Sequence, residues 1–341
     1  MKSFENYKRY NYFLNQFSKC LQNAIDSYKK EPMIHPVLTL YSLNARTSCF
    51  MLQALARIDL KISRHKKIAA VWLNEYKAIE DSLGKVDYWY VYLKQNKYWN
   101  LPAPMFNYVT QQLHLACGIT EERLIKFGWL TKDANGTFQY SSIAHDRFKE
   151  MCKKVKWHKT NKEHQKLLKL FKDESIKIHK KLISNTLDIN KLEEGIHELR
   201  RKLRWIAIYS IALRGKVAIA KHLPGEPLSE YVTAFSQANK YNYLPKKTSK
   251  TLQINFLPGA YYALSEVIQL LGDIKDSGLC TAEFLKIASW YKISTINLKK
   301  LLGKQFKSYN QVVYEARQVV EQHLIKNQVL VHMSEYFNSQ L

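Results

Sequence analysis

The sequence predicts an all-α fold, a duplicated helical-bundle domain with one short β-hairpin. Only 11 glycines and 8 prolines punctuate its 341 residues, and long stretches place apolar residues at i, i+3, i+4 and i+7, as on one face of a helix. An Asn-Gly pair in WLTKDANGTFQYS (129–141) separates two short runs rich in aromatic residues and Thr, which favours a hairpin. The clearest predicted helices are 37–60, 65–82, 161–183, 190–221, 259–272 and 310–337.

Similar segments recur in the two halves of the chain. LPAPMFNYV (101–109) resembles LPGAYYALS (257–265), and TEERLIKFGW (120–129) shares T-x-E-x-L-x-x-x-x-W with TAEFLKIASW (281–290). The matches keep their order and a nearly constant offset, as expected of an internal repeat. We therefore predict a first helical-bundle repeat at 33–152, a basic linker helix at 153–187 and a second repeat at 188–333.

The composition indicates a folded, strongly basic protein. A hydrophobic fraction of 46% excludes general disorder. Lys and Arg number 53 against 29 acidic residues, a net charge of +24, which favours a polyanionic partner over a merely solvated surface. Residues 153–181 alone hold eleven lysines and three acids. They could form a binding face or a solvated connector.

The cysteines and the N-terminus favour a cytoplasmic protein. Five cysteines occur without any C-x-x-C pair, so we expect reduced thiols and neither a zinc site nor a disulfide framework. The N-terminal MKSFENYKRYNYF has no apolar segment typical of a signal peptide. The longest strongly apolar run, 205–213, is about half the length that crosses a bilayer.

A basic cluster begins the segment LEEGIHELRRKLRWIAIY (192–209). His197, Arg200, Arg201 and Arg204 follow the spacing i, i+3, i+4 and i+7, so all four should project from one helix face. From about residue 205 the segment is apolar all round and should be buried. Four like charges at the edge of a core require a partner, either an internal acidic cluster or a phosphate chain that arginine binds bidentately.

The decapeptide IHELRRKLRW (196–205) resembles the histidine-led helix of the conserved histidine α-helical domain (CHAD) family. SLGKVDYW (82–89) is similar to the family's L-G-x-x-R-D segment, although Val86 stands where a basic residue is usual. The resemblance implies two similar helical bundles around a basic cavity that binds inorganic polyphosphate without chemistry. In this chain it implies a main site of His197, Arg200, Arg201 and Arg204.

The first half departs from that pattern. Tyr41 occupies the place of His197, and Asn44, Ala45 and Ser48 replace the basic residues. Any site should therefore be biased toward residues 197–204. Weaker candidates for the same groove are Lys202, Arg46, Lys85 and Lys240.

Enzymatic and metal-binding functions are not expected. The chain has no G-x-x-x-x-G-K-[ST], G-x-G-x-x-G, H-E-x-x-H or G-x-S-x-G motif. His158 and His164 are six residues apart and would not face together on a helix, so they do not predict a metal site. We expect no cofactor.

Nucleic-acid binding is the main alternative. The segment TAEFLKIASWYKISTINLKKLLGKQ (281–305) is similar to a helix-turn-helix, with an apolar first helix, a turn near Lys292 and a basic second helix. It lacks the glycine that is frequent in such turns. A scaffold that docks on an acidic protein or on anionic lipid is a third class, and no sequence motif selects it.

Overall fold

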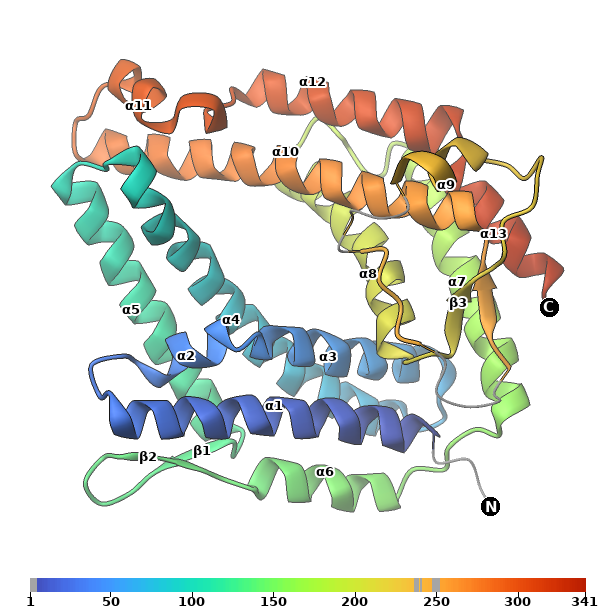
Figure 1. Cartoon of the computed structure of the whole chain (residues 1–341), viewed down its shortest axis with the longest axis horizontal. Helices are drawn as coiled ribbons and strands as arrows, with labels where there is room; N and C mark the ends of the chain where they lie inside the picture. Colours follow the sequence, from blue (N-terminus) through green and yellow to red (C-terminus); the bar gives the residue numbers. More distant parts are fainter. Residues whose placement is uncertain (1–4, 236–238, 240, 247–251) are drawn as a thin grey trace. The chain divides into compact units, whose positions relative to one another are not determined.

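A computed structural model shows an all-α protein, as the sequence predicts (Figure 1). The chain is 74% helical, and the structure describes residues 5–235, 239, 241–246 and 252–341. It divides into two compact units, Met1–His158 and Lys159–Leu341. We describe each unit by itself.

Unit 1 is built from helices and the predicted hairpin. Its longest helix, α4, packs against α5 and α3, and α3 also packs against α1 (Figure 1). The elements in chain order are α1 (Glu5–Lys30), α2 (Pro36–Ser42), α3 (Ala45–Ile62), α4 (Lys66–Trp99), α5 (Ala103–Lys126), β1 (Leu130–Lys132), β2 (Phe138–Tyr140) and α6 (Ile143–Lys153).

The hairpin follows the prediction closely. Strands β1 and β2 are antiparallel, with Thr131 opposite Gln139. Asp133 Oδ1 accepts hydrogen bonds from the backbone N–H groups of Asn135 and Thr137, both at 2.9 Å. Gly136 adopts φ 77°, a left-handed conformation that suits glycine. The turn is thus set by local chemistry that the sequence displays.

The buried Glu75 carboxylate lies between Trp129, just before β1, and the partly exposed Arg147 of α6. The Glu75 carboxylate accepts a hydrogen bond from the Trp129 indole at 3.1 Å, and Arg147 Nη2 lies 2.5 Å from its other oxygen. Burial raises the pKa of Glu75, although Arg147 and Trp129 oppose the shift. The charge of Glu75 inside the unit therefore depends on these two partners.

Unit 2 contains a long central helix, α10, with α12 beside it and α11 at its C-terminal end (Figure 1). Two short segments, η1 and η3, are π-helices, and η2 is a 3₁₀-helix. The elements in order are α7 (Thr160–Ile183), η1 (Leu192–His197), α8 (Glu198–Ala212), β3 (Val217–Ile219), α9 (Ser229–Phe235), β4 (Ile254–Phe256), α10 (Pro258–Trp290), α11 (Thr295–Leu302), η2 (Gly303–Gln305), α12 (Tyr309–Val319), η3 (Val320–Lys326) and α13 (Val329–Ser339).

The predicted helix 190–221 is wrong at both ends. It starts as a π-helix, and after α8 the backbone turns at Arg214 and Gly215, whose φ values are 42° and 73°. The chain then forms β3, which pairs in parallel with β4. Left-handed residues cannot continue an α-helix, so the two positions end α8.

The other predicted helices differ mainly in their ends. The segment 37–60 is split at Asn44, which adopts φ 59° between α2 and α3. The segments 65–82 and 259–272 lie inside the longer helices α4 and α10, and 310–337 is divided into α12, η3 and α13. The prediction 161–183 coincides with α7 within one residue.

The internal duplication remains a prediction. Segments 101–109 and 257–265 each lead into a long helix with proline in its first turn, α5 and α10. The second pair of similar segments differs, because α5 ends at Lys126 within 120–129, whereas 281–290 lies wholly within α10. The predicted linker 153–187 also has a different place, since α7 is part of unit 2 and packs against α13 and α8.

In the part of the chain that the structure describes, all five cysteines are free thiols, and Cys49, Cys117, Cys152 and Cys280 are buried. Burial raises the pKa of Cys117 and of Cys152 to about 12. Among the described residues, no helix is both long and apolar enough to span a bilayer.

Candidate functional site

The predicted basic cluster lies where η1 passes into α8. Gly195 makes this start possible, because a Cβ at its position would lie 1.8 Å from the backbone oxygen of Asp188. The apolar half of the segment is buried as predicted, including Ile206, Ile208 and Tyr209. The basic residues therefore occupy the first two turns of a helix whose second half is core.

Three of the predicted cations have acidic neighbours on the same helix. His197 Nδ1 lies 2.8 Å from a carboxylate oxygen of Glu193. The Glu198 carboxylate forms ion pairs with Arg201 Nη2 at 2.5 Å and with Lys202 Nζ at 2.6 Å. These ion pairs are local, at i,i+3 and i,i+4, and they reduce the net positive charge that the cluster presents.

The same contacts shift the titration of Glu198. Burial raises its pKa, but hydrogen bonds and charge from Lys202 and Arg201 outweigh that effect and hold the pKa below its ordinary value. Glu198 is therefore ionised at neutral pH, and a polyanion at this position would meet its negative charge.

Arg200 lies against α10. Its Nε donates to the backbone oxygen of Ile268 at 3.1 Å, and Nη2 donates to the Tyr241 hydroxyl at 3.2 Å. Its guanidinium passes so close to Gly272 that a Cβ there would lie 2.8 Å from Nε. Two of the hydrogen-bond donors of Arg200 are therefore already used within unit 2.

The four predicted cations therefore do not form one open face. Arg204 is half-buried, like Arg200 and His197, whereas the Arg201 side chain is 57% exposed. Only Arg201 is well placed to reach a ligand in solution. The alternative of an internal acidic partner describes Arg201 at Glu198, whereas the partners of Arg200 are a carbonyl and a hydroxyl.

Arg46 belongs to unit 1, where it sits in an acidic network. Its Nε and Nη2 lie 3.0 and 2.9 Å from Glu80 Oε1, and Nη1 lies 2.5 Å from Asp87. Tyr41 donates to the same Asp87 carboxylate, and burial together with this hydrogen bond raises the pKa of Tyr41. Arg46 is neutralised by two carboxylates.

The two remaining candidates do not complete a groove. Lys85 is exposed on α4, with its ammonium 6.0 Å from the ring centre of Tyr88. Lys240 lies outside the described residues.

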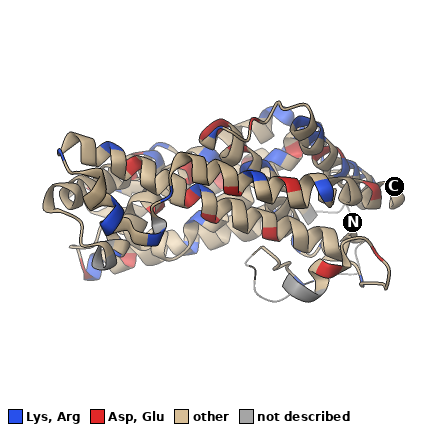
Figure 2. Cartoon of the chain, turned by 90° about the horizontal axis from the view of Figure 1, so that it is seen from above, with Lys and Arg blue, Asp and Glu red and all other residues tan. Residues whose placement is uncertain are grey.

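Charges of both signs follow one another along several helices (Figure 2). Exposed lysines are most concentrated on α7. The lysine row, as we call it, consists of four exposed lysines, Lys162, Lys169, Lys177 and Lys180.

The lysine row follows the helical repeat. Its members are spaced by seven, eight and three residues, which returns each to nearly the same side of α7. At 1.5 Å rise per residue the row spans about 27 Å. Within the described residues the ammonium groups of these four lysines have no ion pair or hydrogen bond. Asp173 is the one acid on the same side.

The opposite side of α7 fixes the row in place. Leu167, Leu168, Phe171 and Ile178 are buried, and α7 packs against α13 and α8. Phe171 stacks on Phe337 of α13 with ring centres 5.5 Å apart. The row is thus carried by a rigid helix. The signal was present in the sequence as lysines at helical spacing within 153–181, although no individual residue there was predicted as a site.

The helix-turn-helix-like segment also contains exposed cations. Its first half is the C-terminal part of α10, and its second helix is α11. Leu298 and Leu302 are the buried residues of α11, and the helix is otherwise largely exposed. Lys292 ends α10 with φ 53°. The second helix is accessible, as the nucleic-acid alternative requires.

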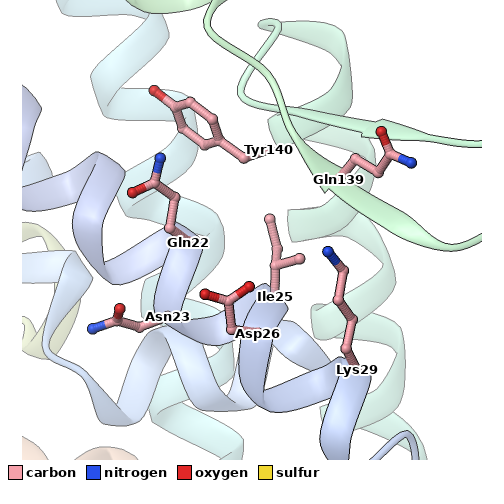
Figure 3. Close-up of a pocket in the computed structure, with 7 residues that line it drawn as sticks. All are labelled: Gln22, Asn23, Ile25, Asp26, Lys29, Gln139 and Tyr140. Carbon is pink, nitrogen blue, oxygen red and sulfur yellow. The ribbon is translucent and has the colours of Figure 1, made fainter.

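One open pocket lies between α1 and β2 in unit 1, with a volume of about 560 Å³ (Figure 3). Its charged residues are Asp26 and Lys29, both exposed. It contains none of the predicted site residues, and one acid beside one base does not favour a polyanion. Its remaining lining residues are Gln22, Asn23, Ile25, Gln139 and Tyr140.

Comparison with known proteins found no matching family model, no matching curated protein and no matching solved structure.

Proposed function

We propose that this protein binds a linear, phosphate-rich polyanion such as inorganic polyphosphate, without chemistry, and that the lysine row of α7 is its principal contact. The observation that carries the proposal is that four exposed lysines on one side of a packed helix have no acidic partner within the described residues. The resemblance to the CHAD family supports the same class of ligand.

Solvation favours the lysine row over the arginines of α8. An exposed, unpaired ammonium is fully hydrated, and binding a phosphate chain releases the counterions condensed on that chain. Arg200 would first have to give up its bonds to Ile268 and Tyr241, and Arg201 would have to leave Glu198. The predicted α8 site therefore contributes chiefly through Arg201 in this proposal.

Lysine also suits an irregular ligand. Its ammonium is a point charge on a flexible stem, with three donors that rotate to meet phosphate oxygens at different heights. A polyphosphate chain offers no fixed planar group that requires the bidentate geometry of arginine. A row about 27 Å long can thus hold a flexible chain without a shaped pocket.

A competition assay tests the proposal. Labelled long-chain polyphosphate is bound to the full-length protein at near-physiological salt and displaced by unlabelled polyphosphate, duplex DNA or single-stranded RNA. The lysine-row variant K162Q/K169Q/K177Q/K180Q should lose most of the affinity. A matched control, K19Q/K30Q/K66Q/K67Q, removes the same charge from exposed lysines of unit 1 and should bind nearly as well as wild type.

Two results would overturn it. Equal weakening by both quadruple variants would mean that net charge, not the row, binds the ligand. Stronger displacement by DNA or RNA than by polyphosphate would assign the protein to nucleic acid.

Nucleic acid is the second candidate because α11 is exposed, as a recognition helix must be. Its eight residues are few, and the helix before it is the 33-residue α10. The variant K299Q/K300Q separates the candidates. It should reduce DNA or RNA affinity only if α11 enters a groove, and it should leave polyphosphate affinity unchanged if α7 binds that ligand.

A further inference from the structure

The end of α10 and the helix that follows form a second basic surface. We call residues 285–304 the α10–α11 tip. From 284 to 314 the sequence contains no Asp or Glu. Five of its lysines belong to the tip, and they are Lys286, Lys292, Lys299, Lys300 and Lys304. The nearest acids in sequence, Glu283 and Glu315, flank the region, and Glu315 is paired with Lys307.

The tip also exposes large apolar side chains. Trp290 is 51% exposed, Tyr291 42% and Ile296 68%. The Lys286 ammonium lies over the Trp290 ring, 5.0 Å from its centre. Soluble surfaces expose single apolar residues routinely. Here three large ones occur within seven residues, among lysines.

The orientation of α11 places charge and apolar surface together. Leu298 and Leu302, one turn apart, are buried against the unit. Ile296 and Lys300 are also one turn apart, on the other side of the helix, and both are exposed. The outward side of α11 therefore combines an aliphatic side chain with cations.

We infer that the α10–α11 tip docks on the surface of a membrane that contains anionic lipid. Lysines gain from the negative potential of the leaflet. Trp and Tyr are favoured at the level of the headgroups, where one end of the ring is apolar and the other meets water. An exposed Ile gains by entering the boundary with the acyl chains. The tip thus supplies each kind of contact that an interfacial anchor uses.

The apolar residues favour lipid over nucleic acid. An aromatic ring can stack on a base, but Ile296 has no flat face to do so. It is more exposed than Trp290 or Tyr291. On a bilayer, by contrast, the same residue removes apolar area from water. The inference is independent of polyphosphate binding, because α7 and the tip share no residues.

Vesicle sedimentation tests it with the full-length protein. Vesicles of equal parts phosphatidylcholine and phosphatidylglycerol should bind the protein, and pure phosphatidylcholine should bind it much less. K299Q/K300Q should weaken binding by about fivefold per lysine, whereas the adjacent exposed pair of unit 1, K66Q/K67Q, should have little effect. W290A/I296A should weaken it at least about tenfold, and L115A, at a 57% exposed leucine of α5, should not.

A spectroscopic readout protects the test from misfolded variants. Brominated acyl chains quench tryptophan only on contact, so vesicles that carry them should dim the wild-type fluorescence, and W290F should abolish that dimming. Quenching that persists in W290F would place another surface on the bilayer. Failure of the wild-type protein to bind anionic vesicles would overturn the inference. If, in addition, K299Q/K300Q lost oligonucleotide binding, the tip would be a nucleic-acid-binding surface.

Discussion

The salt dependence of polyphosphate binding follows from the lysine row. Four lysines without an acidic partner in the described part of the chain can each displace a condensed counterion. For a flexible single strand each neutralised phosphate contributes about −0.7 to the slope of log affinity against log salt, so the row contributes about −2.8. Between about 50 and 200 mM salt, that slope lowers the affinity by roughly 50-fold.

The perturbation is the variant K162Q/K169Q/K177Q/K180Q. Gln and Lys have nearly equal helix propensity, and the four side chains are exposed, so α7 should keep its packing. The slope should become shallower by about 2.8, with the affinity loss greatest at low salt. Fluorescence anisotropy of labelled polyphosphate across a salt series measures both quantities.

The control variant distinguishes binding at the lysine row from binding to the net positive charge of the whole protein. K19Q/K30Q/K66Q/K67Q lowers the net charge from +24 by the same four charges, and it should leave the slope almost unchanged. The reasoning fails if the two variants change the slope equally, or if neither changes it. In the second case the counterions are displaced elsewhere, and Arg201 is the first alternative position.

Three stability predictions use thermal or chemical unfolding. Gly195→Ala should cost more than about 3 kcal/mol, because its Cβ would overlap a backbone oxygen at 1.8 Å, whereas Gly118→Ala, with no atom within 4 Å of the new Cβ, should gain up to about 1 kcal/mol. Arg147→Ala should cost about 2 kcal/mol at neutral pH, less than a fully buried pair because Arg147 is 40% exposed. The cost should shrink in acid, since burial raises the pKa of Glu75 and protonation removes its unpaired charge. Glu198→Gln should cost below about 1 kcal/mol at pH 7. The variant should match wild type well below pH 4.5, the ordinary value, because the gain from a lowered folded pKa is complete above the unfolded pKa and is lost as pH falls through the folded pKa.

The parts of the fold that the sequence predicts correctly are those fixed by local chemistry. The helix α7 has apolar residues at helical spacing from Leu167 onward, and its observed bounds, Thr160–Ile183, agree with 161–183. The hairpin is fixed by Asp133 and the turn at Gly136. Neither depends on a partner distant in the sequence.

The missed elements depend on distant partners or on small backbone changes. Strands β3 and β4 are three residues each and pair Val217 with Ile254, so neither run contains enough residues to show a period. A π-helix shifts the register by one residue and is invisible to a 3.6-residue pattern. The predicted helix 259–272 ends at Gly272, but α10 continues to Trp290. This glycine does not end the helix. Its missing side chain leaves space for the Arg200 guanidinium.

The sequence places the α8 cations at the start of a helix that continues into the core, but it cannot show what they contact. The bonds of Arg200 go to Ile268 and Tyr241, 68 and 41 residues away. One partner is a backbone carbonyl, which no residue pattern can reveal. The neutralisation of Arg46 by Glu80 and Asp87 is equally non-local in sequence.

Arginines and lysines have different surroundings in this protein, and this difference explains why the exposed charge lies on α7 and not at the predicted cluster on α8. Like charges near a core need partners, and at Arg46 and Arg200 the fold supplies them from its own carboxylates, carbonyls and hydroxyls. A planar guanidinium is well suited to such fixed contacts, because its donors are already arranged. The charge that remains available to a ligand is then carried by the lysine row, whose ammonium groups have no ion pair within the described residues. A polyanion should therefore select this protein by the spacing of its lysines along α7, and Arg46 and Arg200 should matter to that affinity mainly by stabilising the unit to which each belongs.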